Sequence, residues 1–417
     1  MSLYTNTHPF TTGIDISSAE FWNQSFEARD TAFSRLRREA PVSWHPPIAY
    51  AQEHSQEGFW AVTRVEDITT VSMNSEVFQS RHGIQMEPLD PELARTGSFF
   101  LAMDAPQHSR YRGLVSAAFT PKRIKGIEDR IKANAARIVD DLVGAGAIDF
   151  VADCSSKLPM ETVSDIVGVP QSERAQVARA AENVVGGADA AGLSDDQALI
   201  IKFEAFTYLR TLGADLAAHR RRSPADDLLT NLVQARIDGE GLTDDDIGDF
   251  MVLMGVAGND TTKQTTTRTM LSLATLPDQR DWLMADFDAR IMPAIDEFVR
   301  HASPVMQFAR TAAEDVELAG SRISAGDKVV MFYCSGNRDE SKFPDPHAFD
   351  LSRPASPHVG FGGGGAHFCL GNGVAKVQLR SIIGELLHRL PNIEFGEPEP
   401  LRSKFINGID ALPAYVR

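Results

Sequence analysis

The chain has 417 residues, of which 43% are hydrophobic, so it can bury a large apolar core. Its formal net charge of −16 argues against general nucleic-acid binding, which needs a dominant basic surface. No basic segment followed by an apolar run opens the chain, and no apolar stretch is long enough to cross a bilayer. We expect a single domain over residues 1–417, because no linker composition divides it. Three widely spaced cysteines favour a reducing, cytoplasmic setting.

The predicted elements are mostly helical, with short strands at the edges. Residues 58–62 (GFWAV) are rich in aromatic and β-branched side chains and predict a strand. From residue 108 to about 276 the pattern is mainly helical. The clearest helix starts after Thr243, where three aspartates follow a threonine cap. Apolar residues follow at helical spacing at Ile247, Phe250, Met251 and Met254, and no proline intervenes until Pro277, which predicts a helix about 50 Å long.

The last third of the chain predicts a helix at 294–302, short strands at 317–320 and 328–333, and a helix at 370–390. An irregular stretch with several prolines and glycines, residues 334–365, precedes the last helix. The predicted fold class is therefore mainly α with small β-sheets.

A glycine-rich loop, GFGGGGAHFCLG at 360–371, places Cys369 directly before the last helix. The loop lacks the lysine of a phosphate loop and the glycine spacing of a dinucleotide fold. His367 and Cys369 alone are too few ligands for zinc, while a nucleophilic cysteine remains possible. Thiolate ligation of haem iron accounts for more of the loop, because a helix N-terminus and unobstructed backbone N–H groups stabilise a charged sulfur.

Together with this loop, four further segments resemble the cytochrome P450 haem-thiolate monooxygenases. They are residues 108–112 (HSRYR), 257–262 (AGNDTT), 297–300 (EFVR) and 349–353 (FDLSR), in the family's order. The resemblance implies a cytochrome P450 fold that binds haem b through Cys369. It also implies insertion of one oxygen atom from O₂ into a C–H bond, with two electrons from a separate ferredoxin and ferredoxin reductase. We expect the protein itself to be a monomer.

The loop departs from the usual pattern at one point. Phe361 lies eight residues before Cys369, where the family usually has seven, so the loop has one extra residue. This lengthened loop resembles the actinobacterial subgroup that hydroxylates methyl-branched lipids and sterol side chains. Residues 357–371 and 333–343 are most similar to its branched-lipid hydroxylases.

The resemblance also implies roles for residues on two helices. Asp260 and Thr261 would deliver protons to oxygen, although a plain polar helix face would look the same. Gly258 would let the helix bulge beside them. Glu297 and Arg300 would join Arg353 in a buried structural network that holds the cysteine loop, rather than forming an exposed ion pair.

Haem propionates require cationic partners, and four positions match those of the family: His108, Arg112, Arg310 and His358. The substrate pocket is expected to be almost entirely apolar, with some of its residues packing the core instead. Its predicted lining residues are Phe100, Val256, Ala257, Met306, Phe308, Phe405 and Ile406. Such a lining favours a long hydrophobic substrate, first a methyl-branched lipid or isoprenoid oxidised near its branched end, and second a sterol side chain or terpenoid.

A local basic cluster stands out in this acidic chain and either is a solvated face or docks an acidic iron–sulfur protein. It consists of Arg110, Lys122, Arg123 and Lys125.

Two other classes of function remain open. A haem sensor without turnover would not need the pair Asp260 and Thr261, and a peroxide-driven peroxygenase would differ at that pair.

Overall fold

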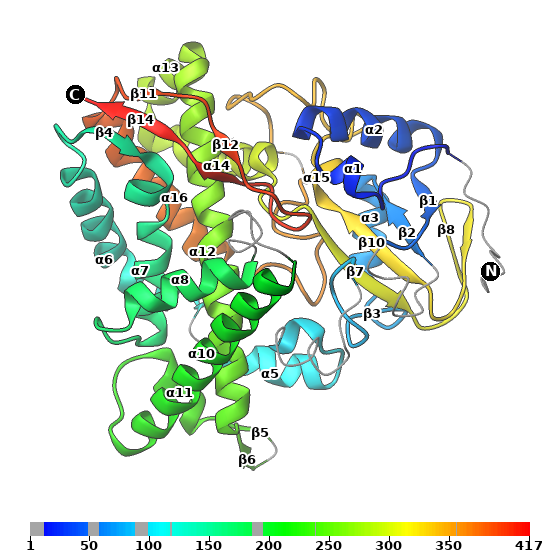
Figure 1. Ribbon diagram of the computed structural model, residues 1–417, viewed down its shortest axis with the longest axis horizontal. Helices are drawn as coiled ribbons and strands as arrows, with labels where there is room; N and C mark the ends of the chain where they lie inside the picture. Colours follow the sequence, from blue (N-terminus) through cyan, green and yellow to red (C-terminus); the bar gives the residue numbers. More distant parts are fainter. Residues whose placement is uncertain are drawn as a thin grey trace.

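The computed structural model describes residues 12–48, 58–87, 99–116, 119–185, 195–237, 239–355 and 357–417. A larger helical part surrounds the long helix α12, and a smaller part holds a five-stranded sheet with α2 beside it (Figure 1). This arrangement confirms the predicted fold class. Within the described ranges, no helix is long and apolar enough to cross a membrane.

The helices account for most of the regular structure. Their bounds are α1 Ala19–Trp22, α2 Phe26–Glu39, α3 Val65–Met73, α5 Gln107–Ser116, α6 Pro121–Asp140, α7 Lys157–Val167, α8 Arg174–Val185, α10 Asp195–Arg222, α11 Leu228–Gln234, α12 Asp244–Thr275, α13 Pro277–Ala285, α14 Phe287–Ala302, α15 Tyr333–Gly336 and α16 Asn372–Arg389. Two short turns add to them, a 3₁₀-helix at Phe99–Ala102 and a π-helix at Val151–Ser155.

The largest sheet has the strand order β1-β2-β10-β7-β3, with β2 and β10 parallel and the other described pairs antiparallel. Its strands are β1 Val42–His45, β2 Phe59–Val62, β3 Phe78–Gln79, β7 Gln307–Ala312 and β10 Lys328–Phe332. The predicted strand at 58–62 is thereby confirmed as β2.

Smaller sheets lie at the edges of the helical part and of the large sheet. One has the order β11-β14-β4, and the other three are two-stranded. Their strands are β4 Gly146–Asp149, β5 Arg236–Ile237, β6 Glu240–Gly241, β8 Val316–Leu318, β9 Ser321–Ile323, β11 Glu394–Phe395, β12 Glu399–Pro400, β13 Ile409–Ala411 and β14 Pro413–Val416.

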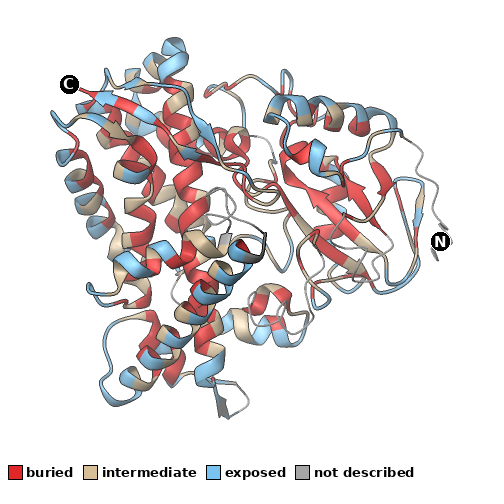
Figure 2. Ribbon diagram, in the orientation of Figure 1, coloured by how far each residue is buried: buried red, intermediate tan, exposed pale blue. Residues whose placement is uncertain are grey.

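Helix α12 forms the centre of the helical part and confirms the predicted long helix. Its N-terminus is a capping box, in which the Asp246 N–H donates to Thr243 Oγ1 (3.0 Å) and the Thr243 N–H donates to Asp246 Oδ2 (2.9 Å). The helix packs against α7, α8, α10 and α16 and is buried along much of its length (Figure 2). The bulge expected at Gly258 is not present, because α12 continues without a break. The glycine instead permits close packing, since a Cβ there would overlap Val163 on α7.

Helix α14 begins at Phe287, earlier than the predicted start at 294. Asp286 caps its first turn, and the helix continues through Pro293. Because a proline usually marks a helix boundary, the interior Pro293 explains why the predicted start at 294 was too late.

The charged side chains of α14 organise the irregular chain that precedes the cysteine loop. Glu297 and Arg300 form a buried bidentate pair, with N–O distances of 2.6 and 2.7 Å. Arg300 also donates to the carbonyls of Asn337 (2.7 Å) and Pro346 (2.8 Å). Arg353 Nε lies 3.3 Å from Glu297 Oε2. The predicted association of Glu297, Arg300 and Arg353 is therefore present in the structure.

Removing the charge of Arg300 should destabilise the protein strongly. Arg300→Met would leave the Glu297 carboxylate and several carbonyls short of a donor, which costs about 3–5 kcal/mol for a buried pair. Arg35→Met, in an exposed pair with Glu39, is the control and should cost less than about 1 kcal/mol. Urea unfolding measures both changes, and equal losses for the two variants would contradict a supporting role for Arg300.

Candidate active site

The glycine loop bends sharply around the position of Cys369. Gly362, Gly364 and Gly365 have φ values of +97°, +93° and +71°, which favour glycine. A Cβ at Gly365 would also overlap the backbone of Ser72 at the end of α3. The run of glycines therefore allows both the tight turns and the close approach of the loop to α3.

Cys369 lies at the end of this loop and just before α16. The Cys369 N–H donates to the carbonyl of Phe361 (3.0 Å), and Asn372 Nδ2 donates to the carbonyl of Cys369 (2.8 Å). Burial raises the pKa of the thiol, while the N–H groups of Gly371 and Asn372 and the charge of Arg112 act to lower it. The start of α16 thus supplies the donors that a negatively charged sulfur requires.

Four basic side chains meet near Cys369, two from α5, one from β7 and one from the loop itself. The rings of His108 on α5 and His367 in the loop have centroids 4.2 Å apart. Arg112 donates to the carbonyl of Phe368, and buried Arg310 on β7 donates to the carbonyl of Ala309. Among the described residues, neither arginine has a carboxylate within ion-pair distance. The structure therefore brings together three of the four predicted propionate partners.

The electrostatics of this cluster fit a bound anion. Burial lowers the pKa of His108 to about 4, with Arg112 as a further cause. Burial likewise lowers the pKa of His367 to about 2, with Arg310 next in size. His108 Nε2 and His367 Nδ1 are buried without a hydrogen-bond partner. Two carboxylates, as on a haem, would satisfy these nitrogens and the charges of the two arginines.

The fourth predicted partner, His358, is not part of this cluster. Its Nε2 lies 3.5 Å from Asp296 Oδ1, and its ring packs 5.8 Å from that of Phe361. His367 occupies the cluster instead, and the sequence analysis did not assign it this role. The sequence feature that could have identified His367 is its position in the loop, two residues before Cys369.

The middle of α12 has one side that is less buried than the rest of the helix. Ala257 is exposed and Thr261 is partly exposed, although most residues around them on the helix are buried. Thr261 Oγ1 donates to the carbonyl of Ala257 (3.1 Å), one turn back. The hydroxyl predicted to act on oxygen therefore lies on the less buried side of α12.

Asp260 turns away from solvent and pairs with a residue that the sequence analysis missed. Lys263 Nζ lies 2.5 Å from Asp260 Oδ1 and 3.5 Å from Glu182 Oε1 on α8. Asp260 Oδ2 is buried without a partner. Burial raises the pKa of Asp260, and the charge of Lys263 opposes that rise. The sequence feature that could have revealed this pair is a lysine three residues after an aspartate in a predicted helix.

The predicted pocket residues separate into two groups. Phe308 and Phe405 meet edge to face at 5.3 Å, and Ile406 forms a β-bridge with Val305 next to them. Val256 and Ala257 lie on α12 at its open side, and Phe100 packs 6.0 Å from the ring of His108.

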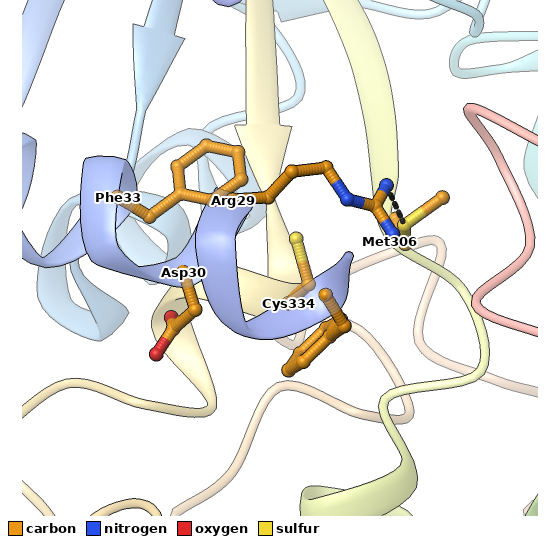
Figure 3. A pocket seen from close by; sticks show the side chains of 6 residues that line it. Arg29, Asp30, Phe33, Met306 and Cys334 are labelled. Atoms are coloured by element: carbon orange, nitrogen blue, oxygen red, sulfur yellow. Dashed lines mark hydrogen bonds between the residues drawn. The ribbon is translucent and has the colours of Figure 1, made fainter. Parts of the chain in front are cut away.

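Met306 does not join this wall. Its sulfur lies 3.4 Å from Arg29 Nη1 on α2, beside Phe33 and Cys334 (Figure 3). The side chain packs on the opposite face of the chain from Phe308, so Met306 belongs to the core under α2.

Comparison with known proteins identifies the class of this site. Residues 207–404 match the family Cytochrome P450. The chain is 39% identical, over 96% of its length and 94% of the relative's, to a methyl-branched lipid omega-hydroxylase of Mycobacterium tuberculosis. It is 37% identical, over 90% and 88%, to a steroid C26-monooxygenase of Mycolicibacterium smegmatis. The chain therefore belongs to the cytochrome P450 family and is a monooxygenase with a haem-thiolate cofactor.

A solved structure supports the same conclusion. A cytochrome P450 of Mycobacterium marinum in complex with pseudoionone superposes with a TM-score of 0.94 at 50% identity, covering 97% of this chain and 99% of that one. The family's haem, when bound, supplies the activation of O₂.

Substitution of the loop cysteine should abolish the thiolate signature. Cys369→Ser removes the only cysteine in the loop, so the reduced CO complex should lose its red-shifted absorption band. Cys334→Ser, at a buried cysteine under α2, is the matched control and should keep the band. A normal band in Cys369→Ser would refute its assignment as the iron ligand.

Proposed function

We propose that this monooxygenase hydroxylates a methyl-branched lipid or isoprenoid near its branched end, with electrons from a ferredoxin and its reductase. The observation that carries the proposal is the apolar wall of Phe308, Phe405 and Ile406. Aromatic and branched side chains can bury a hydrophobic chain, and they offer no partner for a polar group. A branched tip is compact, so it can be held at the reacting position while the tail lies along the wall.

The names of the relatives support this substrate class. Branched lipids and steroid side chains both end in a methyl-branched alkyl group, and pseudoionone is a methyl-branched isoprenoid ketone. Hydroxylation of a sterol side chain or a terpenoid is the second candidate, favoured by the match to a steroid C26-monooxygenase.

Five residues would hold the haem in this proposal. The thiolate of Cys369 would bind the iron, with the first N–H groups of α16 directed at the sulfur. His108, Arg112, Arg310 and His367 would bind the propionates, and His367 takes the place that the sequence analysis assigned to His358. The buried nitrogens without partners support this assignment.

Asp260 and Thr261 would move the protons that oxygen insertion requires. Thr261 lies on the less buried side of α12, and the carboxyl of Asp260 has one oxygen held by Lys263 and the other without a partner among the described residues. A carboxyl whose pKa is raised by burial binds a proton more readily than an exposed one, which suits general acid–base catalysis. Tight coupling of electrons to product in a Thr261→Ala variant would contradict the role of its hydroxyl.

Loss of the Lys263 charge should shift the pH dependence of turnover. In Lys263→Met no cation opposes the burial of Asp260, so the pKa of the carboxyl rises further. The acidic limb of kcat should then move to higher pH. Lys263→Arg keeps the charge, so its limb should stay near that of the wild type. An unmoved limb in Lys263→Met would show that Lys263 does not control Asp260.

The electron donor would dock on the basic residues Arg110, Lys122, Arg123 and Lys125. They lie on α5 and in the first turns of α6, and all four are exposed. Helix α6 packs against α16, which begins just after Cys369. The surface therefore lies on the cysteine side of the site, and its charge complements an acidic partner.

Electron transfer through this surface should depend on charge. Reversing Lys122 and Arg123 to glutamate should slow reduction by ferredoxin and weaken its salt dependence, while substrate affinity stays unchanged. Lys132→Glu, farther along α6, is the control. Stopped-flow reduction at increasing salt measures the effect, and a salt-independent wild-type rate would contradict the proposal.

A matched set of substrates tests the proposed function. An iso-branched fatty acid, its straight-chain isomer, a terpenoid and a sterol are each titrated by the Soret shift and turned over. The branched members should bind more tightly and be oxidised faster at the terminal carbon. Preference for a small polar aromatic compound, or for the straight chain, would overturn the proposal.

A further inference from the structure

Two polar side chains of α12 reach across to the C-terminal turn that carries part of the apolar wall. Gln264 Nε2 donates to the carbonyl of Ile409 (3.0 Å), and the Ile409 N–H donates back to Gln264 Oε1 (2.7 Å). One helical turn on, Arg268 donates to the carbonyl of Asn407 (3.1 Å) and to its Oδ1 (2.8 Å). The side-chain amide of Gln264 thus forms two hydrogen bonds with the backbone of Ile409, as the backbone of a neighbouring strand would.

Asn407 extends this connection to the chain after α14. Its side-chain amide donates to the carbonyl of Ala302 (2.8 Å), and its N–H donates to the carbonyl of Pro304 (2.9 Å). The Met306 N–H donates to the carbonyl of Phe405 (2.8 Å). The segment that carries Phe405 and Ile406 is therefore held on two sides and lies between α12 and the large sheet (Figure 1).

The guanidinium of Arg268 has few alternatives to this contact. Among the described residues no carboxylate lies within ion-pair distance of it. Burial lowers the pKa of Arg268 to about 10, so the group is still charged at neutral pH. Arg268 is half-buried and, among the described residues, donates its hydrogen bonds to Asn407, so the position of Asn407 is costly to change. Gly408 tightens the contact, because a Cβ there would meet Leu401 and Gln264.

Helix α12 therefore carries both the proposed proton-delivery pair and the anchors of the wall. Gln264 lies about 4.5 Å and Arg268 about 10.5 Å along the axis from Thr261, at 1.5 Å per residue. We propose that Gln264 and Arg268, through Asn407 and Ile409, are positioning residues that set which carbon of the substrate is oxidised. They do so without touching the substrate, by fixing Phe405 and Ile406 relative to Thr261. Displacement of a bound group by about 1 Å is enough to change reactivity.

This inference rests on the proposed apolar wall, and product ratios test it separately from the substrate class. The variants are Gln264→Met, which removes both bonds to Ile409, and Arg268→Lys, which keeps the charge but cannot bond both oxygens of Asn407 in the same way. Gln378→Met is the matched control, because Gln378 is also buried but lies on α16 and, in the described part of the chain, makes no hydrogen bond to the wall.

Each protein is given the iso-branched fatty acid and, separately, pseudoionone, and the hydroxylated isomers are quantified by mass spectrometry. The ratio of terminal to subterminal product should change several-fold in Gln264→Met and Arg268→Lys, with a normal thiolate band in the reduced CO complex. Gln378→Met should keep the wild-type ratio. If the wild type oxidises neither compound, the proposed function fails, and the ratio is measured on whichever sterol or terpenoid it does oxidise.

An unchanged ratio in the two folded variants would overturn the inference. An equal change in Gln378→Met would also overturn it, because the effect would then follow from general loosening of the core. Failure of both variants to take up haem would count against it as well, since the contacts would then serve the whole fold rather than selectivity.

Discussion

The path of the chain to the cysteine loop depends on the ion pair and hydrogen bonds of the Arg300 guanidinium. It is buried, paired with Glu297, and directed at the carbonyl of Asn337. Asn337 in turn accepts the N–H of Val359 with its side-chain oxygen (2.9 Å) and donates to Ser303. One arginine on α14 therefore connects, through a single asparagine, to the residue where the glycine loop begins. A segment without helices or strands has no regular backbone hydrogen bonds of its own, so side chains such as these must hold it in place.

Helix α12 performs a second supporting function for the site. Its N-terminus is capped, its middle carries Asp260 and Thr261, and its later turns bind the C-terminal segment through Gln264 and Arg268. A helix is rigid over this length because each turn is bonded to the next. The proposed proton-delivery pair and part of the proposed substrate wall are consequently held in position by the same rigid helix.

Charge is distributed unevenly in this acidic protein. Basic groups without a carboxylate partner among the described residues gather beside the cysteine loop, where burial, together with the charges of Arg112 and Arg310, keeps the pKa of the two neighbouring histidines low. Removing water from several cations at once is unfavourable unless an anion accompanies them. The cofactor of the family carries two such anions, so the folded chain is electrostatically prepared for it.

Much of the protein followed from its sequence. The mainly helical fold, the long helix after Thr243, the cysteine loop and the family were all predicted, because each depends on residues close together in the chain. Periodicity, caps and short motifs are local properties, so they can be recognised in the sequence without any tertiary information.

Other features were decided only by the tertiary structure. The sequence assigned His358 to the propionate cluster, whereas the fold places it against Asp296 and brings His367 there instead. It assigned Met306 to the pocket, whereas the sulfur points to Arg29. The partnership of Gln264 with Ile409 had no sequence signal at all. Which face a side chain takes in irregular chain, and which distant segment meets it, depends on the packing of elements far apart in sequence, and no local pattern records that packing.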